Sequence, residues 1–124
     1  MHVLVVDDSS TIRHEVGRAL TGFSCDFAEN GLVALRLALA RRYDLILTDL
    51  TMPLLDGLKF IGRIRSGGKN QETPILILSS RKDEEAVFGA RDLGVQGYIL
   101  KPFAPEDLLG RVRAALSRSG GAAE

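Results

Sequence analysis

Short apolar runs alternate along this chain with longer segments in which apolar residues recur at helical spacing. The apolar runs have the length and β-branched content of buried strands. They are residues 2–6, 24–28, 44–48, 75–78 and 98–100. The helical segments begin near residues 10, 31, 58, 83 and 105. Alternation of this kind is typical of an α/β domain in which helices cover both faces of a parallel sheet.

Several helix boundaries carry the residues expected at helix ends. Ser9 or Ser10 can cap the first helix, and Asn30 can cap the second, because their side-chain oxygens accept hydrogen bonds from free backbone N–H groups. Gly22 and Gly94 follow helical segments, where a glycine commonly ends the helix. These residues support the predicted helices independently of the apolar pattern.

Length and composition indicate one globular domain. The chain has 124 residues and 45% hydrophobic content, which suits a single packed core. We expect the domain to span residues 1–118 and a flexible C-terminal tail to span residues 119–124, as a free end or a truncated linker.

Charge and cysteine content narrow the expected partners and compartment. Sixteen basic and sixteen acidic residues balance, so the net charge suggests neither nucleic acid nor a membrane surface as a partner. Cys25 is the single cysteine, which excludes an internal disulfide and favours the cytoplasm. No apolar run is long enough for a signal-peptide core or a membrane span.

Five polar residues stand at the ends of the strand-like runs. They are Asp7, Asp8, Asp49, Ser79 and Lys101. In an open parallel sheet, ligands bind in the crevice outside the carboxyl ends of the strands, so residues far apart in sequence can meet there. We therefore expect these side chains to form one site.

The chemistry of these residues predicts a metal and a phosphoryl group. Carboxylates brought together repel one another unless a cation joins them, and Mg²⁺ prefers such oxygen ligands. A lysine and a hydroxyl beside the ion can neutralise and orient phosphoryl oxygens. Taken singly, each residue is more typical of a turn, a cap or a loop. Their joint placement at successive strand ends favours one phosphate-handling site.

These residues also resemble those of a known family, the receiver domains of two-component response regulators, of the single-domain chemotaxis type. The resemblance depends on the pair Asp7–Asp8, the segment DLTMPLLDG (49–57), Ser79 and the segment YILKPF (98–103). It implies a doubly wound, flavodoxin-like fold with a five-stranded parallel sheet in the order 2-1-3-4-5 and five flanking helices.

The resemblance implies a role for each site residue. Asp49 would be the nucleophile that accepts a phosphoryl group from a sensor histidine kinase or phosphotransfer protein. Asp8 and Asp49 would bind Mg²⁺ directly, Asp7 would act through water, and the backbone carbonyl of Thr51 would supply a further ligand. Lys101 would pair with a phosphoryl oxygen.

The family also implies a conformational switch. The Ser79 hydroxyl would move to the phosphoryl group, and Tyr98 would turn inward, which would change the face formed by the fourth helix, fifth strand and fifth helix. A downstream protein would bind that face. Pro53 and Gly57 would shape the loop after Asp49, and the Lys101–Pro102 bond is one where the family commonly has a cis peptide.

Some positions depart from the commonest family pattern. Ala104 stands where many relatives have a capping residue for the last helix, and Ser80 stands where alanine or glycine is usual. Thr51 and Arg81 occupy two variable positions that help set the lifetime of the phosphoryl group in this family. That lifetime is not readable from the sequence.

The sequence thus predicts a cytoplasmic signalling protein that catalyses only its own phosphorylation and dephosphorylation, with no direct nucleic-acid or membrane partner, as a monomer or a phosphorylation-dependent dimer. The main alternative is a receiver-like scaffold that is never phosphorylated. A hydrolase with an aspartyl-phosphate intermediate is disfavoured because DDSS lacks a D-x-D arrangement, and no G-x-x-x-x-G-K loop indicates nucleotide binding. The kinase and the output pathway are left open.

Overall fold

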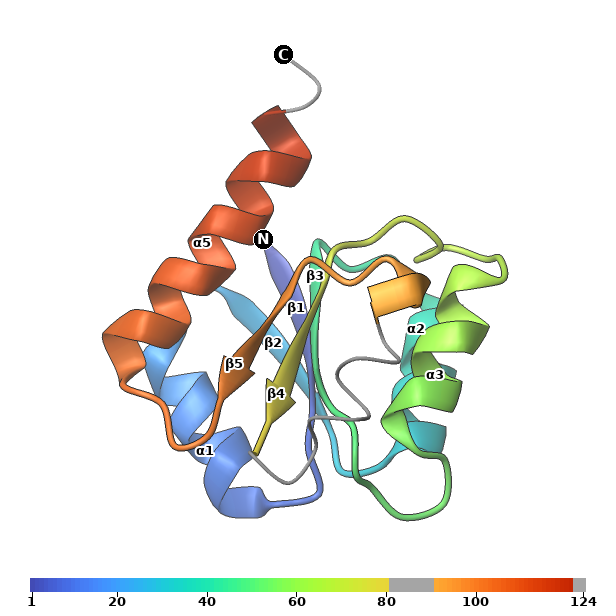
Figure 1. Cartoon of the computed structure of the whole chain (residues 1–124), viewed down its shortest axis with the longest axis horizontal. Helices are drawn as coiled ribbons and strands as arrows, with labels where there is room; N and C mark the ends of the chain where they lie inside the picture. The colour runs from blue at the N-terminus through green and yellow to red at the C-terminus, as the bar shows by residue number, and fades with distance from the viewer. Residues whose placement is uncertain (81–90, 122–124) are drawn as a thin grey trace.

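The computed structural model describes residues 1–80 and 91–121. At its centre is a five-stranded parallel sheet in the order β2-β1-β3-β4-β5 (Figure 1). The strands are β1 (His2–Val6), β2 (Ser24–Ala28), β3 (Leu45–Asp49), β4 (Ile75–Ser79) and β5 (Gly97–Leu100). This confirms the predicted sheet and its order. The three central strands are apolar along nearly their whole length, because both faces of the sheet are covered.

The register of the strands brings their carboxyl ends to one edge of the sheet. Val6 of β1 pairs with Thr48 of β3, and Asp49 pairs with Leu78 of β4. Ser79 then pairs with Leu100 of β5. Asp49 and Ser79 are therefore the last residues of β3 and β4. The sequence pattern predicts each of them one position beyond the end of its strand.

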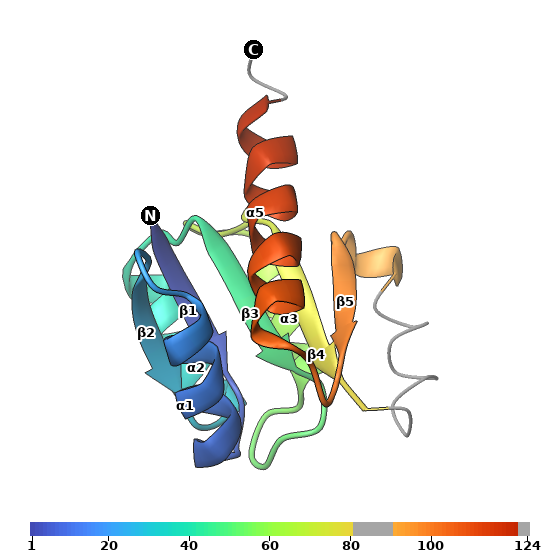
Figure 2. The same cartoon turned by 90° about the vertical axis from the view of Figure 1, so that its left-hand side faces the viewer.

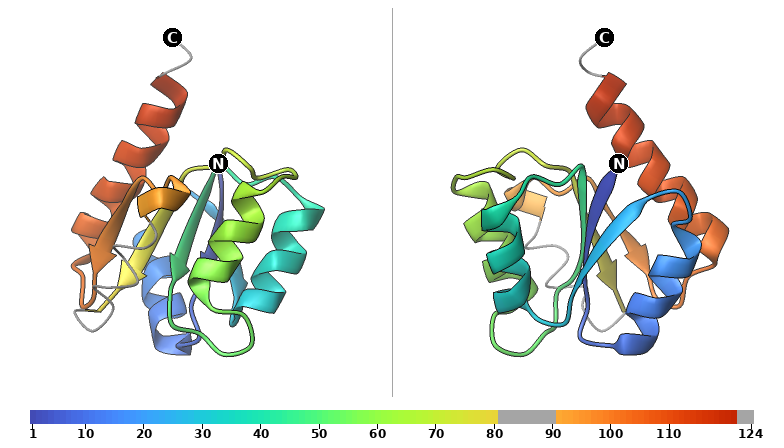
Figure 3. Two further views of the ribbon diagram at one scale, coloured as in Figure 1. Left: turned by 45° about the vertical axis from the view of Figure 1, so that its right-hand side comes forward. Right: turned by 180° about the vertical axis from the view of Figure 1, so that it is seen from behind.

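Helices cover both faces of the sheet (Figures 2 and 3). They are α1 (Ser10–Ala19), α2 (Gly31–Ala40), α3 (Gly57–Arg65), the short 3₁₀ helix η2 (Arg91–Leu93) and α5 (Pro105–Gly121). Helices α1 and α5 lie on one face, and α2 and α3 lie on the other. Each face has its own apolar core: Leu4 and Ile46 point to the α2/α3 side, whereas Val5 and Leu47 point to the α1/α5 side.

The prediction of five helices is confirmed in part. Four α-helices lie in the described residues, and the helix predicted from about residue 83 falls in 81–90, outside them. The flexible tail expected over 119–124 stays a prediction, although α5 continues past residue 118 to Gly121. Within the described part of the chain, no helix combines the length and apolarity that crossing a membrane requires.

Side-chain caps fix where three helices begin. The Ser9 hydroxyl accepts a hydrogen bond from the Ile12 N–H at 3.2 Å, so Ser9, one of the two expected residues, caps α1. Asn30 caps α2 through the Val33 N–H at 2.9 Å, as predicted. Asp56 caps α3, which the sequence analysis did not identify. The first of these caps sets the start of α1 beside the predicted site.

Candidate functional site

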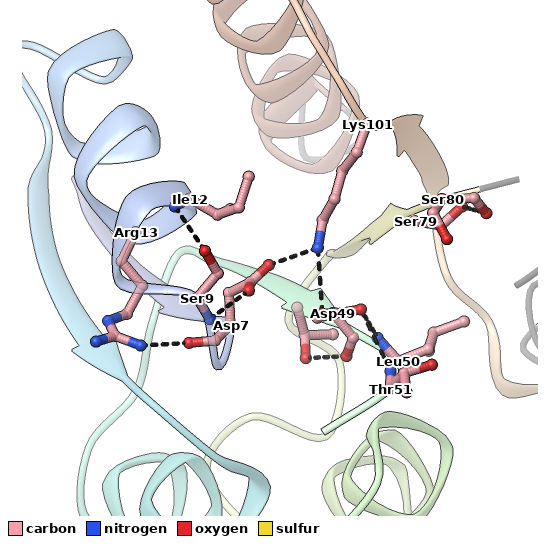
Figure 4. A network of polar contacts seen from close by, with 11 residues as sticks. Asp7, Ser9, Ile12, Arg13, Asp49, Leu50, Thr51, Ser79, Ser80 and Lys101 are labelled. Atoms are coloured by element: carbon pink, nitrogen blue, oxygen red, sulfur yellow. Dashed lines mark hydrogen bonds and ion pairs between the residues drawn. The ribbon is translucent and has the colours of Figure 1, made fainter. Parts of the chain in front are cut away.

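Three carboxylates meet at the carboxyl edge of the sheet. Asp7 and Asp8 directly follow β1, and Asp49 ends β3. One oxygen from each of the three can be chosen so that all lie within 4.8 Å of one another. Asp7 and Asp49 are buried, with 0% and 5% exposure, whereas Asp8 is exposed. The predicted convergence of these three residues is therefore observed. Figure 4 shows two of them, Asp7 and Asp49, with the end of the Lys101 side chain close to both.

Asp7 is held firmly by its neighbours. Its Oδ1 accepts from the Ser9 N–H at 2.9 Å, and its backbone carbonyl accepts from Arg13 Nη1 at 2.6 Å. Its Oδ2 forms an ion pair with Lys101 Nζ at 2.8 Å. Arg13 was missed from the sequence because a helical arginine gives no signal of which carbonyl it binds.

Asp49 is fixed by its own backbone neighbours. Its Oδ1 accepts from the N–H groups of Leu50 at 2.7 Å and Thr51 at 3.2 Å, and its Oδ2 lies 3.1 Å from Lys101 Nζ. Burial raises the pKa of Asp49 above its ordinary value and the charge of Asp7 adds to this, although Lys101 acts in the opposite direction. Asp49 is thus an oriented carboxylate in a poorly solvated, negatively charged position.

Lys101 bridges two of the carboxylates from the end of β5. Its ammonium group contacts both Asp7 and Asp49, and its side chain is only 20% exposed. Burial alone would lower the pKa of Lys101, but the two carboxylates outweigh this, so its pKa is raised and the group stays charged. The bond from Lys101 to Pro102 is cis, as expected.

Among the residues that the structure describes, the site carries more negative than positive charge. One ammonium group faces three carboxylates, so the Coulomb repulsion among the carboxylates is only partly compensated. The side-chain atoms that meet here are carboxylate oxygens. This donor set fits a hard divalent cation such as Mg²⁺.

Ser79, the last residue of β4, and Tyr98, within β5, do not belong to the group of three carboxylates. Ser79 is 2% exposed, and its hydroxyl donates to the Ser80 carbonyl at 3.3 Å (Figure 4). Tyr98 lies on β5 with 52% of its surface exposed. The roles predicted for these two residues stay predictions, because they concern a second conformation.

The loop from Thr51 to Asp56 closes back on the end of β3. The Gly57 N–H donates to the Leu50 carbonyl at 2.8 Å, and an added Cβ at Gly57 would lie 2.4 Å from the Asp49 carbonyl oxygen. Pro53 is exposed, and its carbonyl accepts from the Leu55 N–H at 3.0 Å. Gly57 thus permits a close approach that no other residue allows, which agrees with the loop-shaping role expected for it.

The sequence matches a family model, and the fold matches solved structures. Residues 3–113 match the response regulator receiver domain. The structure resembles the chemotaxis response regulator CheY4 of Vibrio cholerae with a TM-score of 0.85 and 34% identity, over 92% of this chain and 97% of that one. It also resembles the REC domain of AraT, a response regulator from Geobacillus stearothermophilus, with a TM-score of 0.89 and 27% identity, over 99% and 98% of the two chains.

Curated relatives are longer than this chain. The response regulator MprA of Mycobacterium avium is 39% identical over 121 residues, which cover 96% of this chain and 52% of that protein. MprA of Mycobacterium leprae is 38% identical over the same shares. The chain therefore spans about half the length of the curated relatives it matches.

Proposed function

The chain belongs to the response regulator receiver domain family, whose members are phosphorylation-dependent switches of two-component systems, and on that premise we propose that Asp49 is its phosphoacceptor. The observation that carries the proposal is the meeting of three carboxylates and Lys101 at one edge of the sheet. The donor would be the phosphohistidine of a sensor kinase or phosphotransfer protein.

The proposed reaction is a transfer of one phosphoryl group from nitrogen to oxygen. A lone pair on an Asp49 carboxylate oxygen forms the new O–P bond while the N–P bond of the phosphohistidine breaks. The N–P bonding pair returns to the imidazole, which takes up a proton from solvent. Backbone N–H groups of Leu50 and Thr51 orient the nucleophile, and Lys101, already 3.1 Å from Asp49, is placed to pair with a phosphoryl oxygen.

We propose that Asp7, Asp8, Asp49 and the Thr51 carbonyl would hold a Mg²⁺ ion. The three carboxylates that meet here, of which Asp7 and Asp49 already share one ammonium group, support this assignment. Bound there, the ion would supply positive charge that offsets the charge of the carboxylates and of the incoming phosphoryl oxygens. Asp8, as the exposed member of the three, lies where a hydrated ion can enter.

The output would be a change in partner binding. We propose that Ser79 and Tyr98 carry the switch and that a downstream protein binds the face that includes β5 and α5. Tyr98 and Leu100, with 52% and 41% exposure, leave apolar surface on that face for a partner. Catalysis by the chain itself would be limited to phosphorylation and dephosphorylation at Asp49, and we place the domain in the cytoplasm.

Intact mass spectrometry tests the proposal directly. The protein is incubated with Mg²⁺ and acetyl phosphate, and we expect the mass of one phosphoryl group to appear on the parent chain and not on Asp49→Asn. Asp26→Asn is the matched control, because it removes a different carboxylate, and it should be labelled normally. Label on Asp49→Asn would exclude Asp49 as the acceptor. No label on the parent chain would favour the unphosphorylated scaffold.

A further inference from the structure

Arg13 reaches back from α1 to the residue that follows β1, where the pair of adjacent carboxylates begins. Arg13 is half-buried, and its Nη1 donates to the backbone carbonyl of Asp7 at 2.6 Å (Figure 4). The helix that carries it has a fixed start, because Ser9 caps α1 through the Ile12 N–H. The phosphoryl transfer to Asp49 does not use Arg13, although this contact lies within the site.

The main chain of Asp7 is held on both sides of its Cα atom. Its N–H donates to the carbonyl of Ala28, the last residue of β2, at 3.1 Å. Its side-chain Oδ1 accepts from the Ser9 N–H at 2.9 Å. Since β1 ends at Val6, the Asp7 carbonyl lies beyond the strand, and Arg13 donates the hydrogen bond that it accepts there. Arg13 therefore fixes the group of the Asp7 main chain that the sheet does not fix.

This hydrogen bond controls the peptide group that joins Asp7 to Asp8. The carbonyl of Asp7 and the N–H of Asp8 belong to one planar group, so fixing the carbonyl fixes the plane. The plane in turn sets the direction in which the Asp8 side chain leaves the main chain. Asp8 is exposed, so packing does not hold its side chain in place. The relative orientation of the two carboxylates therefore depends on this peptide group.

Mg²⁺ and Ca²⁺ differ in how strictly they require such an orientation. Mg²⁺ needs near-ideal octahedral geometry with short bonds to oxygen, whereas Ca²⁺ accepts flexible geometry and longer bonds. Groups that orient metal ligands without touching the metal commonly change its affinity by about 10- to 100-fold. A donor that fixes the Asp7–Asp8 peptide should therefore favour Mg²⁺ over Ca²⁺.

The charge of Arg13 acts against cation binding. A guanidinium group beside Asp7 repels an incoming Mg²⁺ ion, so removal of the charge alone would strengthen Mg²⁺ binding. Loss of the hydrogen bond to the Asp7 carbonyl would weaken Mg²⁺ binding, because the carboxylates would no longer be oriented. The two effects have opposite signs, so a measured change in Kd distinguishes them.

We propose that Arg13 is a positioning residue of the Mg²⁺ site, which fixes the peptide between Asp7 and Asp8 so that the two carboxylates face the ion in the geometry that Mg²⁺ requires. Arg13 thereby sets a preference for Mg²⁺ over Ca²⁺. The inference rests on the proposed function, and specifically on the proposed Mg²⁺ site. Arg13 touches neither the ion nor the phosphoryl group in this scheme.

The test measures the Kd of both ions on the full chain. The ¹⁵N-labelled protein is titrated with MgCl₂ or CaCl₂ at constant ionic strength, and the backbone amide shifts are followed by NMR. Arg13→Met keeps an apolar stem and removes the donor, and Arg13→Gln carries a donor too short to reach the Asp7 carbonyl. Arg18→Met is the matched control, because it removes the same charge from an exposed arginine of α1. Urea denaturation without metal shows whether each variant is folded.

We expect the Mg²⁺ Kd of Arg13→Met and Arg13→Gln to rise roughly tenfold, as for loss of a group that orients metal ligands. The Ca²⁺ Kd should rise by less than about threefold, because Ca²⁺ tolerates a misoriented pair of carboxylates. The ratio of the two Kd values should therefore shift in both Arg13 variants. Arg18→Met should keep the parent ratio.

Several results would overturn the inference. Tighter Mg²⁺ binding in the Arg13 variants would show that Arg13 acts through its charge. Equal weakening for the two ions, or loss of folding in both variants, would assign Arg13 to the fold and not to the metal. Unchanged Kd values would exclude Arg13 and leave the Mg²⁺ site standing, whereas a parent chain that responds to neither ion would reject the Mg²⁺ site itself and the inference with it.

Discussion

Two clusters of charged side chains lie toward opposite ends of β1, and they differ in how well their carboxylates are satisfied. In the first, which we call the Asp26 cluster, one carboxylate oxygen lies near three groups: Tyr43 OH at 2.7 Å, His2 Nε2 at 3.1 Å and Arg41 Nη1 at 3.2 Å. In the second, the Asp49 cluster, the carboxylates of Asp7 and Asp49 share the ammonium group of Lys101, and Asp8 adds a third carboxylate nearby.

The pKa of Asp26 and the pKa of Asp49 are shifted in opposite directions. Burial acts to raise the pKa of Asp26, but hydrogen bonds from Tyr43 and His2 and nearby positive charge hold it below its ordinary value. Burial raises the pKa of Asp49, and the charge of Asp7 adds to it. A carboxylate whose hydrogen bonds and counter-charges come from its protein neighbours stabilises the folded chain. A cluster with excess negative charge can instead bind an ion and a phosphoryl group.

The largest expected effect comes from removing the one cation of the Asp49 cluster. Lys101→Met leaves Asp7 and Asp49 buried beside each other without a counter-charge, so we expect a loss of about 3 kcal/mol in the free energy of unfolding at pH 7 without Mg²⁺. Urea denaturation followed by circular dichroism measures it. Lys59→Met, at an exposed lysine of α3, should change stability by less than about 0.5 kcal/mol. Equal losses in the two variants would contradict our account of the cluster.

The second prediction uses Mg²⁺ to satisfy the Asp49 cluster. An ion that binds the folded state alone raises stability by about 2.7 kcal/mol at a hundred times its Kd. We therefore expect MgCl₂ to raise the thermal midpoint of the parent chain relative to NaCl of equal ionic strength.

The two clusters should differ in that experiment. Asp8→Asn removes an exposed side chain that we propose as a ligand, with little effect on the ion-free fold, and it should lose most of the rise. Asp26→Asn should keep the whole rise, because Asp26 belongs to the satisfied cluster. A midpoint that does not respond to MgCl₂ in the parent chain would argue against a metal site.

The difference between the clusters also explains what could be predicted from the sequence. The strands were predicted to within about one residue at their ends, because buried parallel strands are nearly continuous apolar runs. The meeting of Asp7, Asp8, Asp49 and Lys101 followed from the same argument, since parallel strands end at one edge of the sheet. Both predictions depend on topology alone.

Other features depend on register and side-chain reach, which a sequence does not reveal. His2 gave no signal, yet it approaches Asp26 because His2 pairs with Ser24, two residues away on β2. The contacts of Arg65 are a second example, since its guanidinium donates to the carbonyls of Leu93, Gly94 and Gln71. The positive φ of Leu54 was equally unforeseen, because a leucine carries none of the usual signs of such a turn.

The smallest expected effect comes from the Asp26 cluster and has a defined pH dependence. Asp26→Asn keeps an acceptor for Tyr43 and removes the charge that Arg41 faces. Because the Asp26 side chain is 29% exposed, solvent screens that charge, and we expect a loss of about 1 kcal/mol in unfolding free energy at pH 7.

The sign of the pH effect follows from the lowered pKa of Asp26. A carboxylate with a lowered folded-state pKa contributes its full stability above the unfolded pKa, here the ordinary value of 3.8, and loses it as the pH falls through the folded pKa. The gap in stability between the parent chain and Asp26→Asn should therefore still be present at pH 5 and shrink as the pH falls below 3.8. Urea denaturation across this range measures it, with Glu29→Gln, an exposed acid, as the control. A gap that grew as the pH fell below 3.8 would mean that Asp26 is strained by its neighbours and not stabilised by them, and the contrast with Asp49 would be lost.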